Sequence, residues 1–274
     1  MTTVGNGSQG AHQKPATAAR MYDYYLGGIH NFPADQEAAK AVLLYSPVIR
    51  ASVRANRAFL GRAVRYLTSI GVRQFLDIGS GIPTEGNVHQ IAQADIPDAR
   101  VVYVDIDPEA VAESIELLEG NPFATAIRAN ARAPQEILDH PQVRKMIDFD
   151  QPVAVLLVAI MHFVEDNDEA RDIVAKLRAS LVPGSHLVLA HATVDEQVFD
   201  PAWLKHTKEV YKRQTTTPLT PRTKDDVTRL FDGFELVEPG LVWQTLWRPD
   251  PDAVDEFKEE PHKSGLYAGV GRLA

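Results

Sequence analysis

The chain has 274 residues, of which 28 are Lys or Arg and 37 are Asp or Glu, so its formal net charge is −9 at pH 7. Hydrophobic residues make up 45% and charged residues 24%, a globular composition that excludes a disordered, collagen-like or coiled-coil chain. An acidic surface repels a phosphate backbone, so we expect no nucleic-acid partner. The chain has no cysteine, which excludes disulfides, thiolate nucleophiles and cysteine zinc sites.

The first seventy residues favour helices. Residues 1–14 are polar and rich in Gly, Ser and Gln, so we expect a disordered leader there and no secretory signal. Helices are predicted over Ala18–Leu26, Ala34–Leu44 and Val48–Ile70, each ending at a glycine or shortly before a proline. Residues 15–71 are therefore expected to form an all-helical N-terminal cap.

From residue 72 onward, short apolar runs alternate with amphipathic segments, the pattern of βαβ units in a mainly parallel sheet. The longest apolar run, Val153–Met161, has about half the length that a membrane helix needs, so we expect a soluble cytoplasmic protein with no membrane partner. The predicted strands are Gln74–Ile78, Arg100–Val104, Ala124–Arg128, Val153–Ala159 and Ser185–Ala190, and the predicted helices are Glu85–Gln93, Pro108–Leu118, Pro134–Leu138 and Asp166–Leu181.

The C-terminal part departs from this alternation. Residues 195–233, rich in Asp, Thr and Lys, are expected to be an elaboration with helical stretches. The apolar segments Phe234–Val237 and Val242–Trp247 flank the turn-forming segment Glu238–Leu241, which predicts an antiparallel hairpin. The sheet of residues 72–274 should therefore be parallel in its first part and antiparallel at its end.

The most informative stretch is QFLDIGSGIPT, residues 74–84. An apolar strand runs into Gly79, Ser80 and Gly81 and then into a helix predicted to begin near Thr84. Glycines at such a turn let backbone N–H groups approach a ligand, and the helix N-terminus favours negative charge. A plain tight turn has the same pattern, so neighbouring residues must decide between the two interpretations.

Two carboxylates and one missing glycine narrow the choice of ligand. Asp77 stands at the strand end, where it would face a cation or an amine, and the next strand ends in Asp105, placed for a ribose diol. Thr84 stands where the dinucleotide fingerprint has its third glycine. Asp77 and Thr84 both disfavour a pyrophosphate, although a nicotinamide dinucleotide enzyme remains an alternative. S-adenosylmethionine, which has an amino group and a ribose but no phosphate, fits better.

The order D-I-G-S-G followed by V-D-I-D-P resembles class I S-adenosylmethionine-dependent methyltransferases, and more narrowly the actinobacterial S-adenosyl methyltransferase family, formerly a domain of unknown function. The chain departs from that family's usual pattern at Ile29, where Lys is common, and at Asn130, where Asp is common. The matching segments cover nearly the whole chain: PATAARMYDYYLGGIHNFPAD (15–35), RANRAFLGRAVRYL (54–67), RQFLDIGSGIPTEGNVHQIAQ (73–93), ARVVYVDIDP (99–108), LLVAIMHFVED (156–166) and GLYAGVGR (265–272).

The resemblance implies a fold and an activity. The fold would be α/β, with a Rossmann-like seven-stranded, mostly parallel sheet, an antiparallel terminal hairpin and the N-terminal helical cap. The activity would be methyl transfer from S-adenosylmethionine to an unidentified small or medium organic acceptor. A non-catalytic protein that binds S-adenosylmethionine or S-adenosylhomocysteine is the alternative, because the same binding residues would serve it.

The resemblance also implies roles for the residues at the strand ends. Gly79 and Gly81 would line the methionine end of the cofactor. Asp77 would bind its amine, unless it only caps the following helix. Asp105 would bind the ribose hydroxyls, with Asp107 as the nearest competitor for that role.

Three further residues complete the expected cofactor site. Asn130, after the third strand, would contact the adenine edge or else serve as a turn amide. In the cap, Arg20 would pair with the methionine carboxylate, and a tyrosine ring, with Tyr22 as the candidate, would lie near the sulfonium. Tyrosines that simply pack a helical hairpin are the competing interpretation. Asn56 and Arg57 face either the pocket or water.

His162 follows the fourth strand, at the sheet edge where ligands of open α/β sheets bind. Its ordinary pKa would let it take a proton near neutral pH, so it is the candidate catalytic base. A histidine that hydrogen-bonds the backbone and shapes the pocket is the other interpretation. Trp203 and Tyr211 are acceptor-site candidates by position. No metal-ligand spacing occurs, so we predict no metal.

Overall fold

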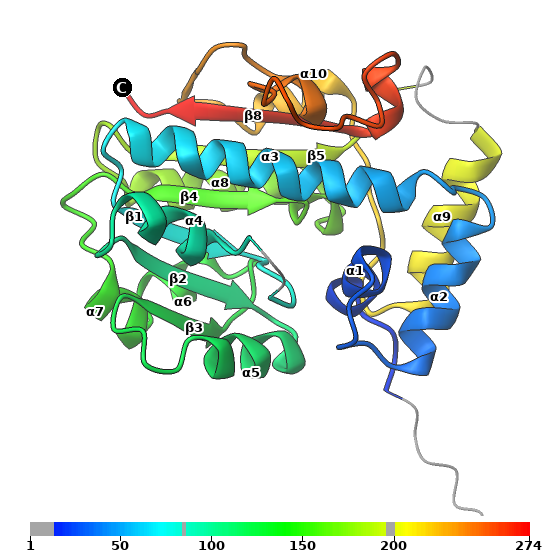
Figure 1. Ribbon diagram of the computed structural model, residues 1–274, viewed down its shortest axis with the longest axis horizontal. Helices are drawn as coiled ribbons and strands as arrows, with labels where there is room; N and C mark the ends of the chain where they lie inside the picture. The colour runs from blue at the N-terminus through cyan, green and yellow to red at the C-terminus, as the bar shows by residue number, and fades with distance from the viewer. Residues whose placement is uncertain (1–13, 84–85, 196–200) are drawn as a thin grey trace, which may run out of the picture.

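In the computed structural model (Figure 1), three helices of the described residues precede the first strand: α1 (Ala18–Leu26), α2 (Pro33–Leu43) and α3 (Ile49–Ser69). The structure describes residues 14–83, 86–195 and 201–274, so nearly all of the predicted leader lies outside the described residues. The Oγ1 of Thr17 caps α1, and Gly27 ends it at φ 85°, in the left-handed region. The helical character predicted for this part of the chain is confirmed.

The central sheet has the order β3-β2-β1-β4-β5-β8-β6, and its first five strands are parallel. This confirms the mostly parallel α/β fold. Strand β8 pairs antiparallel with β5 over seven residues. The strands of this main path are β1 (Gln74–Ile78), β2 (Arg100–Asp105), β3 (Ala124–Arg128), β4 (Ala154–Val158), β5 (His186–Ala192) and β8 (Leu266–Arg272).

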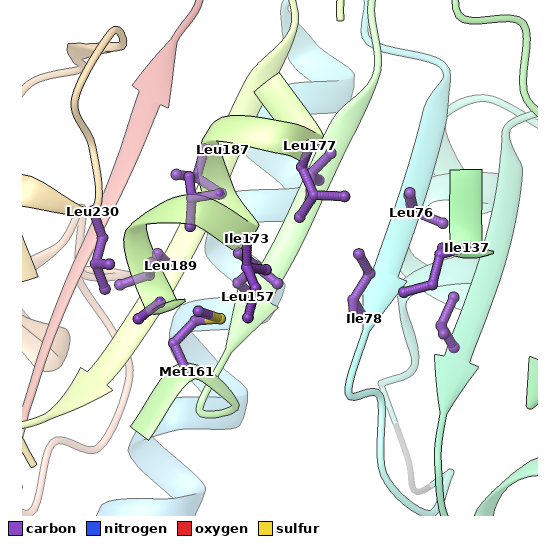
Figure 2. Close-up of a cluster of buried hydrophobic side chains, with 14 of the residues drawn as sticks. Leu76, Ile78, Ile137, Leu157, Met161, Ile173, Leu177, Leu187, Leu189 and Leu230 are labelled. Atoms are coloured by element: carbon purple, nitrogen blue, oxygen red, sulfur yellow. The ribbon is translucent and has the colours of Figure 1, made fainter. Parts of the chain in front are cut away.

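Helices cover both faces of the sheet because its strands are apolar on both faces. Phe75 of β1 packs with residues of α3 and α4, whereas Leu76 and Ile78 pack on the opposite face against α6 and α8, as Figure 2 shows. Each fully buried side chain of this size stabilises the fold by about 1.5–3 kcal/mol. The remaining helices are α4 (Val88–Asp95), α5 (Pro108–Leu117), α6 (Pro134–Leu138), α7 (Pro141–Met146), α8 (Asn167–Ala179), α9 (Pro201–Gln214) and α10 (Lys224–Arg229).

The predicted terminal hairpin is wrong in its pairing. Strands β6 (Glu235–Leu236) and β7 (Val242–Trp243) do not pair with each other; both pair antiparallel with β8. They occupy one position at the sheet edge, so the sheet is seven strands wide although it contains eight. The segment Pro239-Gly240, interpreted from the sequence as a hairpin turn, instead interrupts a single edge strand.

Strand β8 was not predicted because glycine is rare in strands. Its glycines make room for aromatic rings. A Cβ added to Gly271 would lie 2.8 Å from the Cβ of Phe234 and 2.9 Å from the Cδ1 of Phe231, and one on Gly269 would lie 3.3 Å from the Cζ of Phe231. The packing of the aromatic rings at this edge therefore requires glycine at positions 269 and 271.

Two helices also differ from the prediction. The helix after the glycine turn begins at Val88, with Asn87 as its N-cap, rather than near Thr84, which lies outside the described residues. Helix α9, in the expected elaboration, joins the cap: Val210 and Tyr211 pack with Met21 and Tyr25 of α1. Figure 1 shows α1, α2 and α9 together beyond the arrowheads of the parallel strands. No helix in the described ranges is long and apolar enough to cross a membrane.

Two glycine substitutions should change stability in opposite directions. At Gly61, inside α3, a Cβ would make only ordinary contacts of 3.4 Å or more, so Gly61→Ala should raise the free energy of unfolding by about 0.5–1 kcal/mol. Gly271→Ala should lower it by about 1–3 kcal/mol, because the added atom overlaps two phenylalanines. Urea unfolding of both variants measures this, and equal shifts would contradict the packing described for β8.

Candidate active site

A cavity of about 440 Å³ lies at the carboxyl ends of the parallel strands. The turns after β1, β2 and β4 form one side of it, and α1, α3, α9 and residues 216–221 form the other. Its volume is in the range of small-molecule sites. Of the eight predicted site residues, only Asn130 is not among the lining residues; Asp77, Gly79, Gly81, Asp105, Arg20, Tyr22 and His162 all line the cavity.

The glycine turn is held in a conformation that favours glycine. Gly79 and Gly81 have φ of 75° and 67°. A Cβ on Gly79 would lie 2.5 Å from the Cγ1 of Ile160, whereas one on Gly81 would meet nothing within 4 Å. The backbone N–H of Gly79 donates to the Val104 carbonyl at 2.7 Å. The turn is therefore anchored to β2, and Gly81 leaves its side of the cavity open.

Asp105 ends β2 and fastens the turn in place. Its Oδ2 accepts from the N–H of Gly81 at 2.8 Å, and its Oδ1 accepts from the N–H of Asp107 at 2.8 Å. Burial raises the pKa of Asp105, and these two N–H groups oppose that shift. Each carboxylate oxygen keeps a further lone pair, so the side chain can still accept hydrogen bonds from a ligand.

Asp77 is a buried carboxylate in the same wall, with 5% of its surface exposed. Burial raises its pKa to about 7; the guanidinium of Arg57 opposes the shift, and the charge of Asp105 adds to it. The interpretation of Asp77 as a helix cap is wrong, because Asn87 caps α4. The guanidinium of Arg57 compensates the negative charge of Asp77 only in part, so a ligand cation beside Asp77 would stabilise the ionised carboxylate.

Arg20 lines the cavity, but its guanidinium is engaged with the protein. It donates to Asp35 Oδ2 at 2.8 Å, to Asp107 Oδ2 at 3.0 Å and to the Pro15 carbonyl at 2.5 Å. Thr17 Oγ1 also donates to Asp107, at 2.6 Å. These bonds tie the cap to the turn after β2. Arg20 and Asp107 are expected from the sequence only to bind a ligand, so this structural role was not predicted.

Other cap and α3 residues face the cavity beside this tie. The hydroxyl of Tyr22 donates to the Val53 carbonyl at 3.1 Å and accepts from Nδ2 of Asn56 at 3.0 Å. Burial raises the pKa of Tyr22, so its ring stays neutral. Arg57 lines the cavity as well, and its Nη2 donates to the Gly86 carbonyl at 3.1 Å. Arg57 is thus a cationic group on the Asp77 side of the site.

His162 lies in the short turn Met161–Phe163 after β4. The chain enters this turn through Ala159, at φ 60°. The Nδ1 of His162 accepts from the N–H of Ala192 at 3.3 Å, so the proton of the neutral ring is on Nε2. Burial lowers the pKa of His162 well below its ordinary value, and His191 and Arg222 add to the shift. This geometry does not favour the predicted role as a base.

Asn130 is placed differently from the other candidates. Its Oδ1 accepts from the N–H of Arg132 at 3.0 Å, which is the turn-amide arrangement. The acceptor-site candidates Trp203 and Tyr211 do line the cavity. So do residues that no motif marked, because they come from distant segments: Thr216, Leu219, Pro221 and Ser264. Among the described residues, no group of three His, Asp or Glu could hold a metal ion.

Residues 6–274 match the sequence model of a family described as S-adenosyl methyltransferase. A crystal structure from Thermobifida fusca YX, provisionally described as a methyltransferase, is 41% identical, with 95% of each chain covered and a TM-score of 0.87. A DUF574 family protein from Streptomyces avermitilis MA-4680 is 39% identical, with 95% of this chain and 98% of that chain covered and a TM-score of 0.88.

More distant proteins share only the fold. An O-methyltransferase family protein from Burkholderia thailandensis is 14% identical, with 95% of this chain and 64% of that chain covered and a TM-score of 0.53. No curated protein matches the chain in sequence.

Replacing Asp77 should stabilise the protein in a pH-dependent way. The folded-state pKa, about 7, lies above the ordinary value of 3.8, so ionisation opposes folding increasingly as pH rises between these values. The side chain of Asp77→Asn cannot ionise. The difference in the free energy of unfolding between this variant and the wild type should therefore increase from pH 5 to pH 7 and stay constant at higher pH. The limiting gain is about 4 kcal/mol.

Thermal unfolding of wild type and variant across this range measures the difference. The exposed Asp150→Asn is the control, and its difference from wild type should stay flat. A flat difference for Asp77→Asn would contradict the raised pKa.

Proposed function

The chain belongs to the S-adenosyl methyltransferase family, and from that premise we propose that this cavity binds S-adenosylmethionine against the turns after β1 and β2 and a small or medium organic acceptor beneath the cap. The protein is an S-adenosylmethionine-dependent methyltransferase. One observation carries the proposed site: two buried carboxylates, Asp77 and Asp105, line the cavity together with Gly79 and Gly81.

The residues at this end fit the cofactor. Asp77 has the charge to receive the ammonium, and Asp105 has free lone pairs for the two ribose hydroxyls. Ile82 and Ile106 line the same end and would provide apolar surroundings for the adenine. Asn130 is kept as a candidate for the adenine edge, although its Oδ1 already has a partner in the turn.

The cap residues would complete the methionine end. Arg57 is the guanidinium we assign to the methionine carboxylate, because it lines the cavity near enough to Asp77 to oppose the rise in the pKa of that carboxyl. The guanidinium of Arg20 donates to Asp35, Asp107 and Pro15. Arg20 would act by holding the cap over the cavity. The neutral ring of Tyr22 would lie near the sulfonium, where a π-face stabilises positive charge.

The protein's contribution to the reaction would be alignment and exclusion of water. When bound, S-adenosylmethionine supplies a methyl group on a positively charged sulfur that is already a strong electrophile. The turns after β1 and β2 fix one partner, and α1, α9 and the turn after β4 enclose the other. Holding two reactants in line in a closed cavity accounts for a large part of such a barrier.

A non-catalytic binding protein would share this cofactor site. Acceptor-dependent release of S-adenosylhomocysteine distinguishes the two, because only an enzyme forms it. A nicotinamide dinucleotide enzyme would instead bind NAD, which a titration measures. The cytoplasmic location and the absence of nucleic-acid partners stay predictions.

Removing the Asp105 carboxylate should weaken cofactor binding. Calorimetric titration of wild type with S-adenosylmethionine should show micromolar affinity, and Asp105→Ala should weaken it at least tenfold, since hydrogen bonds to a charged group are each worth about 1.5–3 kcal/mol. Asn130→Ala is the paired variant: unchanged affinity would assign Asn130 to its turn, and a similar loss would assign it to the adenine edge. Wild-type affinity in Asp105→Ala would overturn the proposed site.

Cofactor affinity should also depend on pH through Asp77. Below about pH 7 the carboxyl of the free protein is protonated, so binding an ammonium requires loss of that proton. The dissociation constant of S-adenosylmethionine should rise by up to tenfold per pH unit between pH 7 and pH 5.5. Asp77→Asn should bind weakly at pH 7.5 and show a flat profile. A flat wild-type profile would contradict the pairing of Asp77 with the amine.

A further inference from the structure

Behind His162 lies a buried arginine whose donors are all engaged. Arg222 is 3% exposed, and its hydrogen bonds hold the loop that carries His162. Burial lowers the pKa of Arg222, and the nearby charges of Asp226 and Asp166 oppose that shift, yet no ion pair with Arg222 forms among the described residues. Its acceptors are uncharged groups: Asn167 Oδ1 (2.7 Å), the carbonyls of Met161 (3.0 Å), Val164 (2.7 Å) and Asp166 (3.3 Å), and His191 Nε2 (2.9 Å).

These contacts fix the protons of two histidines. Because Arg222 only donates, Nε2 of His191 must accept, and its Nδ1–H therefore donates to the Ala192 carbonyl at 2.7 Å. The N–H of Ala192 in turn donates to Nδ1 of His162. The ring centroids of His162 and His191 lie 5.5 Å apart. His162 is thereby left with its one ring proton on Nε2, and a positive charge lies behind the pair.

The cavity wall near His162 is aromatic. The ring centroid of Phe163 lies 4.5 Å from that of His162 and 5.9 Å from that of Tyr211. Leu219 packs in the same apolar cluster as Phe163 and Tyr211. Trp203 also lines the cavity.

Resting on the proposed function, we infer that His162 acts as a hydrogen-bond donor, through Nε2–H, to the oxygen of a phenol-type acceptor that reacts as its phenolate. A flat ring suits the aromatic walls. An N–H backed by Arg222 suits an anionic oxygen better than a neutral hydroxyl, which would need a base to remove its proton. The N–H of Ala192 fixes the tautomer of His162, and Arg222 and His191 are positioning residues that hold the turn and the Ala192 backbone around it.

The step balances without a protein base. The phenol loses its proton to solvent on binding, because the donor favours the anion. The phenolate oxygen then forms a bond to the methyl carbon as the carbon–sulfur bond breaks, and the sulfur keeps that electron pair. The products are an aryl methyl ether and neutral S-adenosylhomocysteine.

Two variants separate a donor from a base. Gln at position 162 can present an amide N–H near the place of Nε2 but cannot take up a proton, and Ala can do neither. The probe is para-nitrophenol, whose phenolate has its own visible absorption band, added to wild type, His162→Gln and His162→Ala saturated with S-adenosylhomocysteine. Calorimetry first measures S-adenosylhomocysteine binding to each protein.

We expect the apparent pKa of bound para-nitrophenol to fall by about one unit in wild type, a tenfold shift toward phenolate typical of one charged hydrogen bond. His162→Gln should keep most of that shift, and His162→Ala should lose it. No binding of the phenol, binding in its neutral form, or equal loss in both variants would overturn the inference while S-adenosylhomocysteine binds. Failure of S-adenosylhomocysteine to bind would overturn the proposed function itself.

The tautomer can be measured without any ligand. In a long-range ¹H–¹⁵N spectrum at pH 7, with the resonances assigned by their loss in His162→Gln, Nδ1 of His162 should show the shift of an unprotonated nitrogen and Nε2 that of an N–H. The reverse tautomer or a protonated ring would overturn the inference.

Discussion

The end of β2 carries the contacts on which the site depends. Asp105 accepts from the backbone of Gly81, and Asp107, two residues on, accepts from Thr17 and Arg20 of the cap. Both carboxylates are buried, and a buried charge that loses a partner is costly. The glycine turn, the strand end and the cap are therefore fixed relative to one another, and the cavity between them has a defined shape before any ligand enters.

The same contacts set the electrostatics of the cofactor end. Burial raises the pKa of Asp77, the charge of Asp105 adds to that shift, and Arg57 opposes it only in part. A ligand with positive charge restores the balance. S-adenosylmethionine has a sulfonium as well as an ammonium, and S-adenosylhomocysteine has lost the first of these. The acidic wall would therefore bind the substrate more strongly than the product, which favours release of the product after transfer.

What the sequence predicted well depends on local chemistry. Both ends of helix α1 were predicted correctly, because the residues that cap it, Thr17 and Gly27, are its immediate neighbours in the sequence. The strand-end carboxylates were found because parallel strands bring their carboxyl ends to one edge. The pairing of β7 with β8 was missed because the two strands are distant in the sequence. Strand β8 itself was missed because Gly269 and Gly271 are unusual in a strand, and only the contact with Phe231 explains them.

The role of His162 could not be predicted from its sequence position either, because it depends on contacts with distant segments. A histidine after β4 has a pKa suited to a base as far as its sequence position tells. Burial removes that suitability, and the N–H of Ala192, thirty residues away, takes up the nitrogen that would otherwise be free to accept a proton. On the proposed function, a methyl acceptor in this cavity would react without a protein base, either as an anion or as a neutral atom that loses its proton after transfer. The positive charge of Arg222 behind the ring favours the anion.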